Sequence, residues 1–237
     1  QVLEQVALLE QRYLGGTPSR RLLGVSTQHY SFAVDAFVRM VKSSGADEYE
    51  FTLRETRTWD IIEDVRTLRS ELGILYRNDF NRNVIDKLLR DSGLVFHPLF
   101  IAEPHIFVSR KNPIAARERA TLADLADLPR LTFDQGANNS FYFAEEILST
   151  LSSKQEIRVS DRATIFNLMI GLNGYTISTG IISDDLDPEI VGVPLDVDER
   201  IEIGWIGPSA IPLTAQAQRY LDEVRAVVAG FGVALLG

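Results

Sequence analysis

Two loops in this sequence carry polar side chains that could bind a small anion. Ser26, Thr27 and Gln28 end an apolar run and lead directly into a helical pattern, so free backbone N–H groups and the positive end of a helix dipole would lie beside them. In the second half, Asn138 and Asn139 stand between another apolar run and a helical pattern, in a loop that leaves N–H groups accessible. We predict a site for a small carboxylate or another oxyanion. The alternative is that these residues only cap helices.

The residues that enzymes use for catalysis form no recognisable motif. The sequence has no G-x-S-x-G nucleophile elbow, P-loop or G-x-G-x-x-G fingerprint, and its lack of cysteine excludes disulfides and thiolate chemistry. His29, His97 and His105 lack the spacing of metal ligands on one element. The acidic residues at 184, 185 and 187 are predicted to form a solvated loop, because no calcium-binding loop pattern surrounds them. We expect no catalysis, no metal and no cofactor.

The charge balance limits the partners of this chain. Its net charge is −9 and it has no run of Lys or Arg, so it should repel a phosphate backbone and is not expected to hold DNA by itself. Its apolar runs are too short to predict a membrane span. The chain starts without Met and without a signal-peptide pattern, so we expect a fragment of a cytoplasmic protein.

Strand-like and helix-like patterns alternate along the chain and would position the two loops. Half-buried or apolar strands are predicted at residues 22–26, 50–55, 72–76, 94–101, 130–133, 156–159, 175–178, 190–193 and 201–206. Amphipathic helices are predicted at residues 34–41, 58–68, 84–89, 141–151, 161–172 and 214–228, with a cap at Thr58. Pro98 implies an edge strand or an irregularity. The alternation predicts parallel sheets covered on both faces, in two α/β lobes joined by crossovers near Ala102 and Gly204.

The segment 103–133 carries a more specific pattern. It reads as a strand, a turn at Asn112-Pro113, a short helix in which Thr121 and Asp124 can form a cap, and a new strand after Pro129. This order resembles the crossover in the effector-binding domain of LysR-type transcriptional regulators, where a Thr-Leu-x-Asp-Leu helix precedes a strand. Residues 72–76 and 169–178 also resemble family segments, although Asn173 stands where the family usually has a second Gly.

The resemblance implies a fold and a domain organisation. The fold is the two-lobed, type 2 periplasmic-binding-protein-like α/β fold with two crossovers between its lobes. Residues 1–16 would be the end of a linker helix, residues 20–101 and 205–237 the first lobe, and residues 102–204 the second. An effector pocket between the lobes would include Ser26, Thr27, Gln28, Tyr76, Asn138, Asn139, Phe166 and Thr176.

The resemblance also implies a function and partners. The domain would bind a small effector, expected to be anionic, and would control DNA binding through an N-terminal domain that is missing here. Effector domains of this family pair into homodimers, full-length proteins are usually tetramers, and the helix at residues 30–41 is a candidate interface. A solute-binding protein of a transporter is the alternative function. An enzyme on the same fold, such as a prephenate dehydratase, is less favoured because the expected Thr-Arg-Phe motif is absent.

Overall fold

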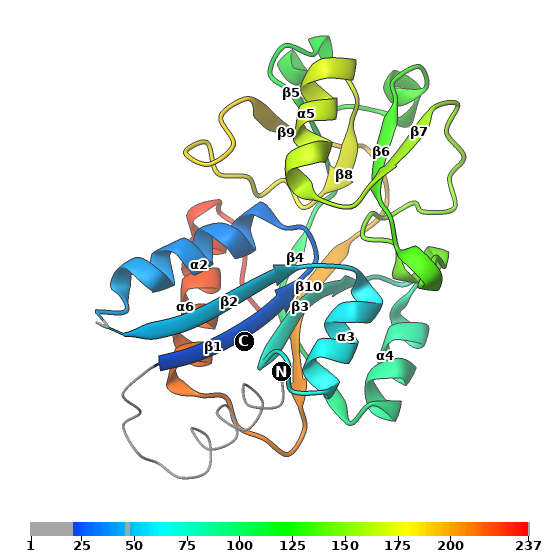
Figure 1. The fold of residues 1–237 in the computed structure, drawn as a ribbon. Coiled ribbons are helices and arrows are strands. Elements are labelled where there is room, and N and C mark those ends of the chain that lie inside the picture. The colour runs from blue at the N-terminus through cyan, green and yellow to red at the C-terminus, as the bar shows by residue number, and fades with distance from the viewer. Residues whose placement is uncertain (1–20, 46–47, 237) are drawn as a thin grey trace.

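The computed structural model describes residues 21–45 and 48–236, which form two α/β lobes stacked one above the other (Figure 1). The linker helix predicted at residues 1–16 lies outside the described residues. Within the described residues, no helix is both long enough and apolar enough to cross a membrane. The predicted order of strands and helices is otherwise largely confirmed.

A five-stranded sheet forms the centre of the first lobe. Its strand order is β2-β1-β3-β10-β4, with bounds Tyr49–Glu55, Arg21–Thr27, Leu72–Arg77, Ile201–Pro208 and Leu94–Ala102. Strand β1 is parallel to β2 and β3, but β10 is antiparallel to both of its neighbours. The sheet is therefore mixed, and the prediction of a parallel sheet was wrong for β10, which returns from the second lobe and enters from the opposite end.

Two pairs of helices cover the two faces of this sheet (Figure 1). One pair is α2 and α6, and the other is α3 and α4, with bounds Ser31–Ser43, Ala215–Gly230, Thr58–Arg66 and Arg82–Asp91. Successive residues of β3 point to opposite faces, so Ile74 packs in the core cluster of α2 and α6 while Leu75 packs in that of α3 and α4. The sheet is thus buried on both sides, as the sequence predicted.

The second lobe contains two smaller sheets. Strand β5 pairs antiparallel with β8 and β9, and β6 pairs parallel with β7; their bounds are His105–Ser109, Thr176–Ser178, Ile190–Pro194, Arg130–Phe133 and Glu156–Val159. The prediction of parallel sheets was therefore also wrong for the sheet of β5, β8 and β9. The single α-helix of this lobe is α5, Arg162–Leu172, which Asp161 caps. Four short 3₁₀ turns lie in its connections, at Pro113–Ala116, Leu122–Leu125, Gly136–Asn138 and Phe141–Phe143.

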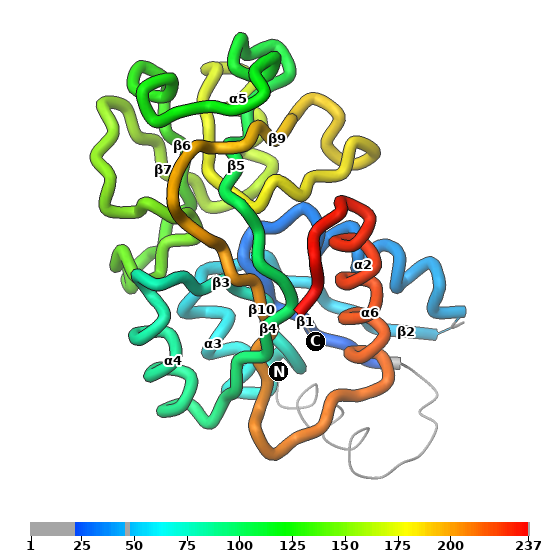
Figure 2. Tube along the Cα trace, turned by 180° about the vertical axis from the view of Figure 1, so that it is seen from behind, coloured from blue at the N-terminus to red at the C-terminus, as the bar shows by residue number. Residues whose placement is uncertain are grey.

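Two strands of chain connect the lobes side by side (Figure 2). Strand β4 leaves the first lobe at Ala102 and pairs there with Ile201, where β10 begins its return. The pairing register shifts opposite Pro98, and β4 is an edge strand, so both readings of this proline are confirmed. Between β5 and β6, Thr121 and Asp124 form the predicted cap, with the Thr121 N–H donating to the Asp124 carboxylate over 2.8 Å.

Three local predictions need correction or refinement. The helix predicted at residues 141–151 does not form: only a 3₁₀ turn at Phe141–Phe143 exists, and Ala144 is extended with ψ 146°. Thr58 is the first residue of α3 and not its cap, since its hydroxyl donates to the carbonyl of Phe143 in the other lobe. Asn173, which stands at the family's glycine position, adopts φ 57° as the left-handed C-cap of α5.

Candidate functional site between the lobes

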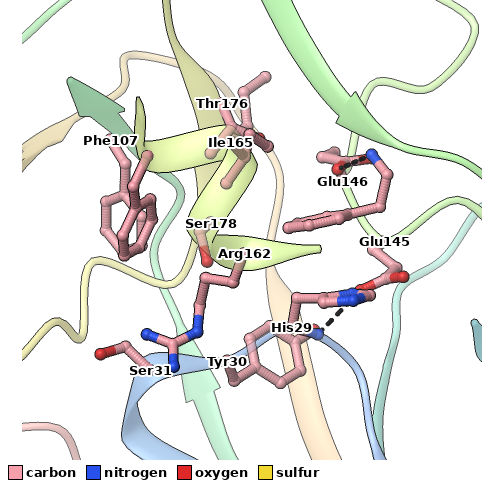
Figure 3. A pocket seen from close by; sticks show the side chains of 13 residues that line it. His29, Tyr30, Ser31, Phe107, Glu145, Glu146, Arg162, Ile165, Thr176 and Ser178 are labelled. Carbon is pink, nitrogen blue, oxygen red and sulfur yellow. Dashed lines mark hydrogen bonds and ion pairs between the residues drawn. The ribbon is translucent and has the colours of Figure 1, made fainter. Parts of the chain in front are cut away.

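A small cavity lies between the two lobes, and both lobes build its wall. The first lobe contributes the residues that lead into α2, and the second contributes β5, β8, α5 and the loop after β6 (Figure 3). The lining combines aromatic rings with ionisable groups: His29, Tyr30, Ser31, Phe107, Phe133, Glu145, Glu146, Arg162, Ile165, Phe166, Thr176, Ile177 and Ser178. A mainly apolar pocket with a few convergent polar groups is typical of small-molecule sites.

The Glu145 carboxylate closes the cavity on the side of α2. One of its oxygens accepts hydrogen bonds from the backbone N–H of His29, over 2.9 Å, and lies 2.9 Å from Nδ1 of the same residue. The other oxygen accepts from the Gln135 side chain over 3.0 Å. Burial alone would lower the pKa of His29, but the carboxylates around it, with Glu145 foremost, outweigh that effect and raise its pKa. Its imidazole also stacks on Phe133 with 4.0 Å between ring centroids.

Glu146 is a second buried carboxyl at the same place. Its side chain accepts a hydrogen bond from the Phe133 N–H over 2.9 Å, and its own carbonyl accepts one from the Tyr76 hydroxyl over 3.3 Å. Burial, followed by repulsion from Glu145, raises the pKa of Glu146 to about 8. At neutral pH this carboxyl is therefore mostly protonated, which lets two neighbouring acidic side chains share one buried region.

Arg162 forms a second connection between the lobes. Its guanidinium donates to Glu55 in the first lobe over 2.9 Å and to Asp187 in the second lobe over 3.2 Å. The Ser31 hydroxyl, at the start of α2, donates to the same Asp187 carboxylate over 2.6 Å. The prediction that the acidic residues at 184–187 form a solvated loop was therefore wrong for Asp187, whose side chain is largely buried in this bridge.

A third connection fixes the loop that follows β6. Arg57 at the start of α3 donates to the Asp134 carboxylate over 2.8 Å and to its carbonyl over 3.1 Å. Gly136 lies against this guanidinium with φ +59°, and a Cβ there would come within 2.5 Å of it. Glycine is favoured at this position by its backbone angle, and any larger residue would also make the Arg57 guanidinium move.

The predicted residues of the first loop lie behind the cavity rather than in its wall. The Ser26 hydroxyl is fully buried, donates to Asp64 over 2.7 Å and lies 2.8 Å from the Ser70 hydroxyl. The Thr27 hydroxyl donates to the adjacent carbonyl of Gln28. These side chains hold the β1–α2 turn to the first lobe, and their role in ligand binding stays a prediction.

Gln28 links several residues around the cavity. Its Nε2 donates to the Thr58 hydroxyl over 2.6 Å, and its Oε1 accepts from the Tyr30 hydroxyl and from the Tyr76 N–H, both over 2.9 Å. Neither Gln28 nor Tyr76 lines the cavity, but both support Tyr30, which does. The structure therefore brings these two predicted residues together in one buried network behind the wall.

The predicted residues of the second lobe separate into two groups. Phe166 and Thr176 line the interlobe cavity, whereas Asn138 and Asn139 do not. Asn139 instead borders a separate depression beside Arg130. Thr176 is 4% exposed, and its hydroxyl lacks a hydrogen-bond partner in the described structure. A buried polar atom without a partner is unusual and marks a position where a bound molecule can supply one.

Several lining residues were missed by reasoning from the sequence. His29 was treated as isolated because its carboxylate partner, Glu145, lies 116 residues away. Glu145 and Glu146 fell within a predicted surface helix, where acidic side chains need no explanation. The signal that could have found them is the polar loop at residues 135–140, which already predicted a functional segment. Among the described residues, no cluster of three or more His, Cys, Asp or Glu could hold a metal ion.

The comparisons with known proteins agree with this geometry. Two α/β lobes with a cavity between them define the class of type 2 periplasmic-binding-protein-like ligand-binding domains. The model of the LysR substrate binding domain matches residues 46–229, and the chain belongs to this family. Its members are effector domains of transcription regulators and not enzymes, so the predicted family and the absence of an enzymatic role are confirmed. No curated protein matches the sequence.

Similar solved structures include regulatory and effector-binding domains. The regulatory domain of MetR from N. meningitidis is 13% identical with a TM-score of 0.59, and 91% of this chain and 98% of that chain align. The effector-binding domain of QuiR in complex with shikimate is 14% identical with a TM-score of 0.56, over 87% and 96% of the two chains. Reduced OxyR is 17% identical with a TM-score of 0.57, over 89% and 97%. These similarities confirm the predicted fold.

Proposed function

We propose that this chain is the sensing domain of a LysR-type transcriptional regulator and that its effector is a small anionic metabolite bound in the interlobe cavity. The regulator would act in the cytoplasm, through a DNA-binding domain outside this chain. The observation that carries the proposal is the buried Thr176 hydroxyl, which lies in the cavity wall without a partner. An anion is favoured because Arg162 and His29 both reach the cavity. Shikimate, which is bound to QuiR, also carries a carboxylate.

A ligand in this cavity would act by changing the balance between lobe arrangements. The contacts that join the lobes include those of Glu145 with His29, Arg162 with Glu55, and Arg57 with Asp134. A ligand that binds one arrangement more tightly than another shifts the population toward it, by no more than its difference in affinity. Transmission to DNA would then depend on contacts between subunits.

The proposed regulator is a homodimer through its effector domains and a tetramer at full length. Helix α2 is the proposed dimer contact, because Val34 and Val38 stay only half-buried beside the exposed Arg39. Sedimentation of the chain tests this contact. Val38→Glu is expected to yield monomers, whereas Asn83→Glu on the exposed face of α4 should leave the association unchanged.

A metabolite panel read by thermal unfolding tests the proposed ligand site. An effector present at 100 times its Kd should stabilise the domain by about 2.7 kcal/mol. Organic acids are expected to be the strongest members of the panel, and Thr176→Val should weaken their binding at least fivefold. If only cationic or neutral compounds bind, the anionic effector is wrong. If binding is unchanged in Thr176→Val, the cavity is not the site.

A further inference from the structure

The carboxylate of Glu145 lies where an anionic effector would be expected to place its own. We propose that Glu145 is an internal ligand of the anion site at the start of α2, and that the effector's carboxylate must displace it. This inference deepens the proposed function and rests on it for the identity of the displacing group. The occupation of the anion site by Glu145 can be tested without any effector.

The groups that hold the Glu145 carboxylate belong to His29, just before helix α2, and to Gln135 in the loop after β6. The first turn of α2 contains no acidic residue, and its N-cap residue, Tyr30, makes no side-chain capping hydrogen bond. Negative charge is stabilised near a helix N-terminus, so this end of α2 lacks a partner of its own. The carboxylates beside it come from the other lobe. Asp187 accepts a hydrogen bond from the Ser31 hydroxyl, and Glu145, 116 residues after His29, accepts one from the His29 N–H two residues before the helix.

The contacts of Glu145 are those of a bound carboxylate. Both oxygens are used: one is held by the backbone N–H and ring of His29, and the other by the side-chain amide of Gln135. The side chains of Glu145 and His29 are only 3% and 4% exposed, so the ion pair is shielded from water. A free carboxylate of an effector could make the same contacts while its body lies against Phe133, which stacks on His29.

The segment that carries Glu145 does not form a regular helix. Its sequence has the helical pattern predicted at residues 141–151, yet the segment contains only a 3₁₀ turn, and Leu148 adopts φ +56°. It also buries Glu146 directly beside Glu145, which places two acidic side chains in one poorly solvated region. Withdrawal of Glu145 would relieve its repulsion of Glu146, which offsets part of the cost of breaking its contacts with His29 and Gln135.

Chemical rescue provides the direct test. Glu145→Ala removes the internal carboxylate and leaves a space that acetate can fill. Because the chain has no cysteine, Arg90→Cys on α4 and Asn167→Cys on α5 can carry a fluorescence pair that reports the distance between the lobes. Both labelled positions are exposed and lie on helices of different lobes.

Without acetate, Glu145→Ala is expected to show more separated lobes than the parent chain. Acetate should bring the lobes together again in a saturable way. Its apparent affinity for the variant should be at least tenfold higher than for the parent chain. Acetamide has the same shape without the charge and serves as the matched control; it should rescue at least tenfold less well. If the lobes of Glu145→Ala lie as close together as those of the parent, and acetate causes no saturable stabilisation or closure of the variant, the inference is wrong.

A second variant provides the test if Glu145→Ala does not fold. Glu145→Gln keeps the size of the side chain and one acceptor but loses the charge, and it should separate the lobes relative to Glu146→Gln. Equal lobe distances in these two variants would also overturn the inference.

The effector itself gives a separate result. Any organic acid found in the panel should bind Glu145→Gln at least tenfold more tightly than the parent, because its competitor is weakened. Acetate rescue without any binding acid would refute the anionic effector and leave the internal ligand intact. Equal affinity of an acid for the parent and for Glu145→Gln, without acetate rescue, would refute the internal ligand alone.

Discussion

The two loops on either side of the cavity are held in place by different contacts. The loop after β1 leads into α2 as the sequence predicts, and its Ser26 and Gln28 side chains form hydrogen bonds inside the first lobe. The loop after β6 does not lead into a helix, and its Asp134 and Glu145 carboxylates bind residues of the first lobe instead. The first loop is therefore fixed by its own lobe, whereas the second is fixed by the interface, which is where a ligand can compete.

The largest effect is expected from Gln28→Leu in the first loop. This change leaves the Tyr76 N–H and the Tyr30 hydroxyl without their buried partner and removes one hydrogen bond to the Thr58 hydroxyl, and it should cost about 3 kcal/mol of unfolding free energy. Urea unfolding measures it. Gln135→Leu in the second loop is the matched control and should cost less than half as much. Equal losses would show that the two loops are held alike.

The next effect is a dependence of stability on pH in the second loop. Glu146 has a pKa of about 8 in the folded chain, set by burial and by Glu145, against 4.5 ordinarily. Between these values the folded state binds more protons than the unfolded state, so stability falls as pH rises. The raised pKa of His29, where nearby carboxylates outweigh burial, has the same sign: its contribution is complete below pH 6.5 and is lost through the higher folded value.

Glu146→Gln should remove most of this dependence. The slope that it abolishes is at most about 1.4 kcal/mol per pH unit, and the variant should be about 2 kcal/mol more stable than the parent at pH 8. Unfolding measured from pH 5 to pH 8 checks the sign. A parent chain that becomes more stable across this range would contradict the burial of a protonated carboxyl beside Glu145.

A smaller effect is expected at Gly136, where the second loop meets Arg57. Gly136→Ala should cost about 1–2 kcal/mol, because φ is +59° and the added methyl would displace the guanidinium. Gly93→Ala is the matched control, since its φ is +69° and nothing lies within 4 Å of the added atom. The difference between the two variants isolates the contact with Arg57. No difference would mean that this connection between the lobes contributes little.

The smallest effect concerns Thr176 in the absence of ligand. Thr176→Val removes a buried hydroxyl that has no partner, so the domain should be unchanged or up to about 1 kcal/mol more stable. A loss above about 1 kcal/mol in urea unfolding would show that the hydroxyl has a structural partner. In that case weaker ligand binding by the variant would say nothing about the site.

The sequence predicted most of the fold because the fold depends on local periodicity. The strands around Ile74 and Ile203 and the helices around Ile61 and Tyr220 carry clear apolar patterns, which the core clusters confirm. The direction of β10 was missed, since periodicity does not distinguish parallel from antiparallel pairing. The helix predicted at residues 141–151 does not form for a related reason. This segment contacts Thr58 and His29 of the first lobe, and these contacts override its helical pattern.

The candidate site was only partly predictable. Phe166 and Thr176 lie in the cavity wall, and Gln28 and Tyr76 lie directly behind it. The ionisable groups were not found, because pairs such as Glu145 with His29 and Arg162 with Glu55 join residues more than 100 positions apart. A loop rich in Gly and Asn indicates where function lies, but not which charges the fold brings to it.

A crystal structure of the chain with the tightest-binding acid of the panel would show directly whether an effector displaces Glu145. The acid is expected to lie between the lobes, to donate to or accept from the Thr176 hydroxyl, and to place its carboxylate at the His29 N–H in place of Glu145. An acid bound outside this cavity, with Glu145 still 2.9 Å from the His29 nitrogen, would contradict this displacement.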